Sequence, residues 1–137
     1  MHIHFCKSNG IAGLIIRFFT FSKWNHVAIQ IGDNVYEATP LGVKRIPNYG
    51  FMQGWSRVTT INLEGLDESA AKKFLDKQLG KPYDWLALVA LPFRKSWQSS
   101  KRWFCSELVS QALIHAGVRE FKIDPWRITP RDLWLML

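Results

Sequence analysis

WNHVAI at residues 24–29 places a histidine at the start of a strand pattern, and WFCSELV at residues 103–109 places a cysteine at the start of a helical pattern. A thiolate is a strong nucleophile at neutral pH, and a neighbouring imidazole both lowers the pKa of the thiol and later protonates the leaving group. The two stretches therefore predict a thiol–imidazole pair in which the base, His26, precedes the nucleophile, Cys105.

The position of Cys105 supports this interpretation. Inward-packing residues recur at helical spacing after it, namely Leu108, Val109, Ala112 and Leu113. The sulfur is then expected near the positive end of a helix, where unpaired backbone N–H groups stabilise a thiolate and bind an oxyanion. The alternative is a buried, inert cysteine. His26 opens a strand, so we expect its imidazole to project from the end of a sheet toward the helix start.

A third polar group is needed to orient the imidazole, and Glu37 is the first candidate. A two-residue turn at Asp33-Asn34 pairs residue 26 with residue 41. Glu37 then shares the face of His26 but lies about 13 Å along it, at roughly 3.3 Å per residue. Thr39 and Gln30 therefore remain as alternatives.

Periodicity predicts an α+β fold in which an antiparallel sheet packs against helices. The expected strands are residues 2–6, 26–32, 35–40, 42–47 and 57–63, with a turn at 48–50. The expected helices are one containing residues 14–19, one from an N-cap at Asp67 to a stop at Gly80, one over 83–93, one over 105–116 and one starting at Pro130.

Composition is that of a globular protein. The 137 residues are 47% hydrophobic and 21% charged, and we expect one domain over residues 1–137. The net charge of +7 favours anionic partners, including phospholipid surfaces and anionic polymers. The basic residues are scattered and no nucleic-acid reader motif is present, so we do not expect nucleic-acid binding.

Segments that would direct the chain to a membrane or out of the cell are not evident in the sequence. Arg17 interrupts the apolar stretch near the amino terminus, and no apolar run reaches membrane-spanning length. Cys6 and Cys105 cannot form a disulfide framework. We therefore expect a cytoplasmic protein in a reducing compartment.

His2, His4 and Cys6 alternate along one expected strand and would lie on one face. No second cluster completes a tetrahedral metal site, so we expect neither a metal nor another cofactor. The turn GKPYDW at residues 80–85 precedes an expected helix, and Tyr83 in it could point its phenol toward the nucleophile.

Together these stretches resemble the permuted papain-like hydrolases of the NlpC superfamily, including YiiX-like proteins and, more distantly, lecithin-retinol acyltransferases. The resemblance rests on residues 24–29 with VYEA at 35–38, on residues 80–85 and on residues 103–109. The closing TPRDL at residues 129–133 also fits. Asn25 departs from the serine frequent at that position, and glutamate at the third polar position resembles YiiX-like members more than the acyltransferases.

The resemblance implies a circularly permuted papain-like fold with the nucleophile at a helix N-terminus. It implies Cys105 as nucleophile, His26 as general base, Glu37 as the third polar residue and Tyr83 as an oxyanion or positioning residue. The implied substrates are peptidoglycan stem peptides, other amide or isopeptide bonds, and lipid esters. The compact form without a signal peptide resembles proteins encoded by bacteria and phages.

Three functions follow as hypotheses. The first is a cysteine peptidase or amidase that works through an acyl-enzyme. The second is a lipid acyltransferase or thiolesterase using the same pair, which the apolar residues 85–93 and the positive charge favour. The third is a non-catalytic binding module that holds its partner in a tryptophan-lined groove. The sequence leaves the oligomeric state open.

Overall fold

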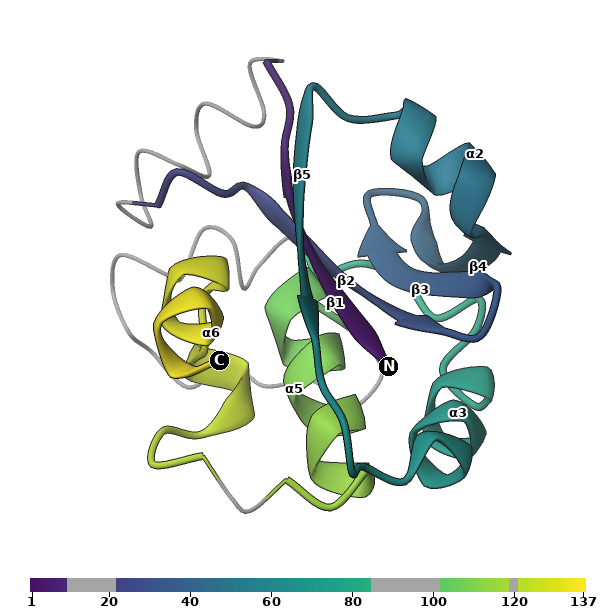
Figure 1. Cartoon of the computed structure of the whole chain (residues 1–137), viewed down its shortest axis with the longest axis vertical. Helices are drawn as coiled ribbons and strands as arrows, with labels where there is room; N and C mark the ends of the chain where they lie inside the picture. The colour runs from purple at the N-terminus through teal and green to yellow at the C-terminus, as the bar shows by residue number, and fades with distance from the viewer. Residues whose placement is uncertain (10–21, 85–101, 119–120) are drawn as a thin grey trace.

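The computed structural model describes residues 1–9, 22–84, 102–118 and 121–137, and its centre is a five-stranded antiparallel sheet (Figure 1). The strands lie in the order β4-β3-β2-β1-β5. They are β1 (His2–Lys7), β2 (His26–Ile31), β3 (Asn34–Thr39), β4 (Gly42–Pro47) and β5 (Arg57–Asn62). The predicted strands agree with these bounds to within one residue at each end, and the α+β class is confirmed.

Helices pack around this sheet. They are α2 (Asn48–Gln53), α3 (Glu68–Asp76), α5 (Cys105–His115) and α6 (Pro130–Met136), with the 3₁₀ helix η2 (Pro125–Arg127) before α6. The helix α5 contacts β2, β3, α3, η2 and α6, so it lies at the centre of the helical layer. Among the described residues, no helix has the length and apolar character needed to cross a membrane.

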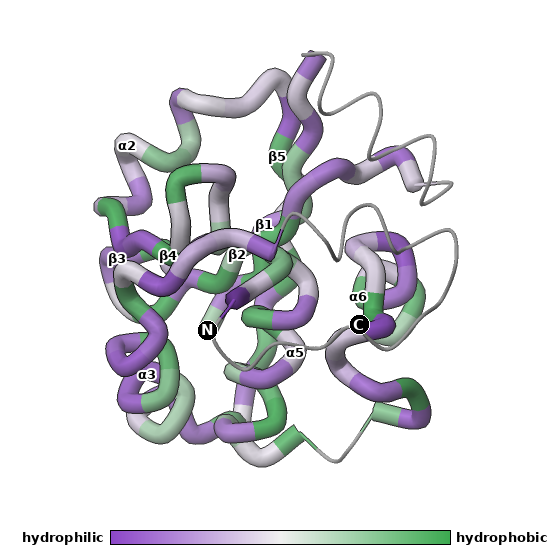
Figure 2. The backbone as a smooth tube through the Cα atoms, turned by 180° about the vertical axis from the view of Figure 1, so that it is seen from behind, coloured by the Kyte–Doolittle hydropathy of each residue, from purple (hydrophilic) through white to green (hydrophobic). Residues whose placement is uncertain are grey.

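The two faces of the sheet bury different sets of residues because side chains alternate along a strand. Val27 and Ile29 of β2 belong to the larger core, which α5 completes with Leu108 and Leu113. The other face buries a smaller cluster of Cys6, Ala28, Val35 and Phe51. Hydrophobic and hydrophilic segments also alternate along α3 in Figure 2, and its buried residues are Ala71 and Leu75.

Helix ends follow the capping rules in three places. The Asp67 side chain accepts from the backbone N–H of Ala70 at 2.9 Å and caps α3, as predicted. Thr129 caps α6 in a capping box with Asp132. Gly117, with φ at 99°, follows the end of α5.

Two expectations about where helices begin and end were wrong. Residues 48–50 begin the helix α2 and do not form a simple turn. The helix α3 ends at Asp76, and not near Gly80. After Asp76 the backbone hydrogen bonds span three residues and not four, as in the bond from Gln78 N–H to Leu75 O at 2.9 Å. Gly80 instead uses its positive φ of 79° in a turn from which its N–H donates to Val43 O at 2.9 Å.

The expected helix containing residues 14–19 lies outside the described residues, as do residues 85–93 of the expected helix over 83–93. Within the described part, Tyr83 does not begin a helix. It forms an isolated parallel bridge with Trp103. The bridge includes backbone bonds from Trp103 N–H to Pro82 O and from Asp84 N–H to Trp103 O, each 3.1 Å long.

Candidate active site

Cys105 is the first residue of α5 and is 1% exposed. The chain enters the helix with Phe104 in an extended conformation, and Phe104 O accepts the helical bond from Leu108 N–H. The inward-facing residues that the sequence predicted, Leu108, Val109, Ala112 and Leu113, are all buried. The helix start is thereby fixed against the sheet, and Cys105 lies in the first turn, at the positive end of the helix.

His26 is the first residue of β2, and Asn25 holds the chain just before it. The backbone N–H of Asn25 donates to Cys6 O at 3.1 Å. Its side-chain oxygen accepts from Ser8 N–H, and its side-chain amide donates to the Ser8 hydroxyl, both at 2.8 Å. The end of β1 and the start of β2 are therefore tied together beside His26.

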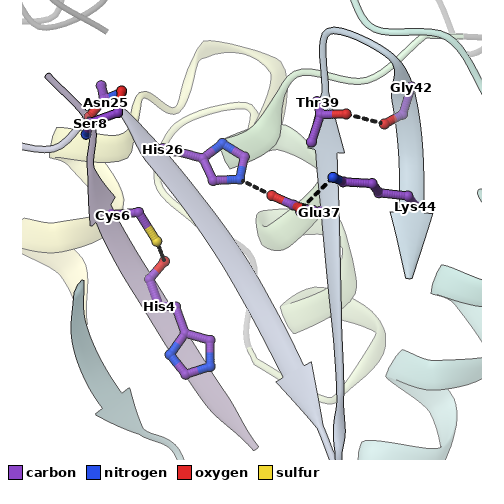
Figure 3. Close-up of polar contacts among 9 residues, drawn as sticks. All are labelled: His4, Cys6, Ser8, Asn25, His26, Glu37, Thr39, Gly42 and Lys44. Atoms are coloured by element: carbon purple, nitrogen blue, oxygen red, sulfur yellow. Dashed lines mark hydrogen bonds and ion pairs between the residues drawn. The ribbon is translucent and has the colours of Figure 1, made fainter. Parts of the chain in front are cut away.

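Glu37 contacts His26 directly (Figure 3). His26 Nε2 donates to Glu37 Oε2 at 2.7 Å, and the other carboxylate oxygen accepts from Lys44 Nζ at 3.2 Å. Glu37 is 3% exposed and His26 7% exposed, so this is a buried, charge-assisted interaction.

The predicted separation of about 13 Å was wrong because the hairpin turn is displaced by one residue. The turn uses Gly32, whose φ is 57°, and Asp33, so that Ile31 pairs with Asn34. Continuing this register places Glu37 opposite Ala28, on the same face as His26 and one diagonal step from it.

The two alternatives to Glu37 form hydrogen bonds elsewhere. The Thr39 hydroxyl donates to Gly42 O at 3.0 Å. Gln30 Oε1 accepts from His4 Nε2 at 2.8 Å, and Gln30 Nε2 donates to Gly32 O at 2.7 Å. Glu37 is thus the candidate that the structure brings to His26.

The charges of this site stabilise one another. Burial alone would lower the pKa of His26, but hydrogen bonding to Cys105 and Glu37, together with their charges, raises this pKa to about 9. Burial alone would raise the pKa of Glu37, but the hydrogen bond and charge of His26, assisted by Lys44, hold it below its ordinary value. At neutral pH the site therefore holds an imidazolium and a carboxylate, with Cys105 next to the imidazolium.

Tyr83 lies beside the start of α5. Its ring packs against that of Phe104, with centroids 5.8 Å apart, and its side chain is 7% exposed. Burial first, and then the charge of nearby Cys105, raises the pKa of Tyr83. The phenol therefore keeps its proton at neutral pH, and it lies near Cys105.

Sequence reasoning missed two residues that contact the His26–Glu37 pair. Lys44 is the direct cross-strand partner of Glu37, a signal that could be used only once the register of β3 and β4 was known. Trp55 stacks on the imidazole of His26, with ring centroids 4.8 Å apart and planes inclined by 12°. Trp55 follows α2 in the chain, and nothing in its sequence neighbourhood singled it out from the other tryptophans.

Glu107 is a further buried acid near the start of α5. Burial, opposed by a backbone hydrogen bond at Phe104 and assisted by the charge of Asp84, raises the pKa of Glu107 to about 7. Glu107 and Asp84 are 6% and 3% exposed, respectively. The carboxyl of Glu107 occupies the first turn of α5, where it interacts favourably with the helix dipole.

The chain was compared with known proteins at three levels. No protein-family model matches it. In an alignment 167 positions long, it is 26% identical to the probable lipoprotein peptidase YaeF of Escherichia coli (strain K12). Among solved structures it is similar to the metalloprotein yiiX from Escherichia coli O157:H7, with a TM-score of 0.61 and 24% sequence identity.

The two matches extend over most of this chain but only part of each relative. They cover 96% of this chain and 61% of YaeF, and 86% of this chain and 66% of yiiX. The chain thus spans less than two thirds of the length of the proteins it matches. It shares the fold of yiiX and has a distant sequence similarity to YaeF, and both likenesses support the resemblance to YiiX-like proteins.

Proposed function

We propose that this chain is a papain-like cysteine hydrolase, circularly permuted so that the base precedes the nucleophile, that cleaves an amide bond. The observation that carries the proposal is the buried His26, which hydrogen-bonds Glu37 on one side and interacts with Cys105 on the other. Burying an imidazolium without a counter-ion would be costly. The carboxylate of Glu37 supplies that counter-ion, which distinguishes His26 from an ordinary, neutral core histidine. The peptidase name of YaeF agrees with the proposal.

In the first half-reaction, the Cys105 thiolate attacks the carbonyl carbon of the scissile amide. Because His26 Nε2 is bonded to Glu37, Nδ1 is the ring nitrogen left to exchange a proton with the thiol. The C–N bond breaks as His26 passes its proton to the departing amine, and a thioester forms on Cys105.

In the second half-reaction, His26 removes a proton from water, which attacks the thioester carbonyl. The products are a free carboxylic acid and the regenerated thiol. The oxyanion that forms in each half-reaction is stabilised by the first-turn N–H groups of α5 and by the Tyr83 hydroxyl. The substrate class is a peptide or isopeptide amide, with the stem peptides of peptidoglycan as the first candidates.

The similar protein yiiX is a metalloprotein, so the side chains that could bind a metal ion in the present chain bear on the mechanism. Within residues 1–9, 22–84, 102–118 and 121–137, no three His, Cys, Asp or Glu side chains are grouped to hold one. His4 bonds Thr60 and Gln30, and His26 bonds Glu37, so neither imidazole is oriented for a shared ion. These residues do not fit a metal site, and the proposed steps use the protein side chains alone.

The first experiment is the rate of Cys105 alkylation by iodoacetamide between pH 5 and 10, with mass spectrometry separating Cys105 from Cys6. We expect labelling at pH 6, well below the ordinary thiol pKa of about 8.5, and at least a tenfold slower reaction in His26→Ala. The Cys6→Ala variant is the matched thiol control and is expected to keep the Cys105 profile.

Hydrolysis of a panel of amides and esters completes the test. Cys105→Ala should abolish cleavage, whereas Cys6→Ala should retain it. Cleavage that survives in Cys105→Ala would overturn the proposed mechanism. Transfer of a phospholipid acyl group to Cys105, without reaction of any peptide, would replace amide hydrolysis with the acyltransferase alternative.

A further inference from the structure

The indole of Trp55 covers one face of the His26 imidazole, and the two rings are nearly parallel. Trp55 is itself supported by Phe51 of α2, with centroids 5.8 Å apart, and Phe51 is 1% exposed. Phe51 in turn contacts the ring of His4, with centroids 5.4 Å apart. A continuous row of rings therefore connects the imidazole of His26 to the buried cluster beneath α2.

Two constraints act on the imidazole at the same time. The Nε2 bond to Glu37 fixes one edge of the ring, and the stacked indole fixes its plane. A ring rotated out of this plane would lose the stacking, and a flipped ring would lose the carboxylate. Stacking on an indole also favours the protonated ring, because the electron-rich face of tryptophan attracts a cation.

We propose that Trp55 is a positioning residue for His26, holding the imidazolium in the plane in which Nε2 donates to Glu37 and Nδ1 faces Cys105. This inference rests on the proposed hydrolase function, because it assigns Trp55 a role in preparing that pair. Trp55 forms no bond with the substrate in this scheme and acts through His26 alone.

Several titratable groups around His26 must be considered in any test. In the described part of the chain they are Glu37 on β3, Cys105 on α5 and Cys6, which is the cross-strand partner of His26 on β1. Lys44 on β4 lies behind Glu37. None of these groups is altered by a substitution at Trp55, so a change in the titration of His26 reports on the indole.

The decisive comparison is between Trp55→Leu and Trp55→Phe. Leucine is apolar and keeps water away from the imidazole but has no ring, whereas phenylalanine keeps a smaller ring in the same place. We expect the pKa of His26 in Trp55→Leu to be lower than in the unsubstituted protein by about half a unit, with Trp55→Phe between the two. Trp126, partly exposed like Trp55 but located in η2, provides the matched control Trp126→Leu.

NMR titration of histidine-labelled protein measures this pKa. In the unsubstituted protein the carbon-bound ring protons of His26 should resonate upfield of their usual position because of the indole ring current. This displacement should vanish in Trp55→Leu, and the rate of Cys105 alkylation at pH 7 should fall about threefold. Trp126→Leu should leave all three readouts unchanged.

An unchanged His26 titration and unchanged Cys105 labelling in Trp55→Leu would overturn the positioning role. Circular dichroism confirms that each variant is folded, and the ring-current displacement in the unsubstituted protein tests the stacking without any substitution. The titration does not depend on catalysis. If His26 responds to Trp55 but Cys105→Ala still hydrolyses the substrate, the proposed function fails while the stacking interaction stands.

Discussion

Glu37 accepts from two cationic groups at once, His26 and Lys44, while being almost fully buried. A buried carboxylate is stable only when its charge is compensated, and here the compensation comes from both neighbouring strands. Together with Cys105, the same carboxylate raises the pKa of the His26 imidazole. The charge of Glu37, and not only its shape, therefore contributes to the charged state of the candidate site.

Glu37→Gln tests this dependence. Glutamine retains an acceptor oxygen for Nε2 but removes the negative charge, so the imidazolium loses its counter-ion. We expect the pKa of His26 to fall by about 1–2 units and the rate of Cys105 alkylation at pH 7 to fall about tenfold. NMR titration and the labelling rate measure the two effects.

Glu64→Gln is the matched control because Glu64 is exposed and bonds only to the neighbouring Asn62 in the described structure. It should leave both quantities unchanged. If Glu37→Gln behaved like Glu64→Gln, the carboxylate would have no role in charging His26.

Residue types and their positions at the starts of a helix pattern and a strand pattern identified Cys105 and His26 as candidates, and Glu37 was the first candidate to orient the imidazole. They could not identify Trp55. Tryptophan is common in this chain, with seven copies, and most such residues fill a core. Only the position of the loop after α2 relative to the start of β2 brings an indole onto the imidazole.

Among the secondary-structure elements, β4 fixes the segment that carries Tyr83. Val43 N–H donates to Lys81 O at 2.8 Å, and Gly80 N–H donates to Val43 O at 2.9 Å. Gly42 permits this approach, because a Cβ at that position would lie 2.8 Å from Lys81 O. The glycine also has a φ of 105°, which L-amino acids rarely adopt.

Gly42→Ala should therefore displace residues 80–83 from β4 and move Tyr83. Gly117→Ala is the matched control, because Gly117 has a φ of 99° but no atom within 4 Å of an added Cβ. We expect Gly117→Ala to lower the free energy of unfolding by about 1–2 kcal/mol, and Gly42→Ala by about 1–3 kcal/mol more. Urea unfolding measures both values, and equal losses would contradict the close approach of Lys81.

Strand and helix assignments came mainly from periodicity, which works well when one face of an element is buried. The α3 and β2–β3 turn errors share a cause. Gly80 was expected to end α3, but the helix ends at Asp76. Asp33 and Asn34 were expected to form the β2–β3 turn, but Gly32 and Asp33 form it. The choice depended on backbone bonds to other segments, such as Gly80 to Val43, which local sequence does not specify.

For the whole molecule, the charged site links stability to pH. A group whose folded pKa is raised contributes stability that is complete below its unfolded pKa and is lost as the pH rises through its folded pKa. For His26 the folded value of about 9 exceeds the ordinary value of 6.5. Its contribution is thus complete below pH 6.5 and declines between pH 6.5 and about 9.

In a Cys105→Ala background, which removes the thiol from this pH range, we expect the difference in unfolding free energy between the proteins with His26 and with His26→Gln to be larger at pH 6 than at pH 9.5. Urea titrations of both proteins at the two pH values measure it. The carboxylate of Glu37 is ionised at both pH values, so its own titration does not enter the comparison. The same difference at both pH values would show that His26 is not preferentially charged in the folded protein.

By itself, the sequence determined the class of the fold, the order of the strands along the chain, and the placement of Cys105 and His26 at the starts of a helix and a strand. These properties follow from local periodicity and capping, which depend on residues close together in the chain. The tertiary structure alone decided that Glu37 reaches His26, that Lys44 compensates Glu37 and that Trp55 stacks on the imidazole. Those contacts depend on strand register and on loops packed across the sheet, where a displacement of one residue in a turn moves a side chain by several ångströms.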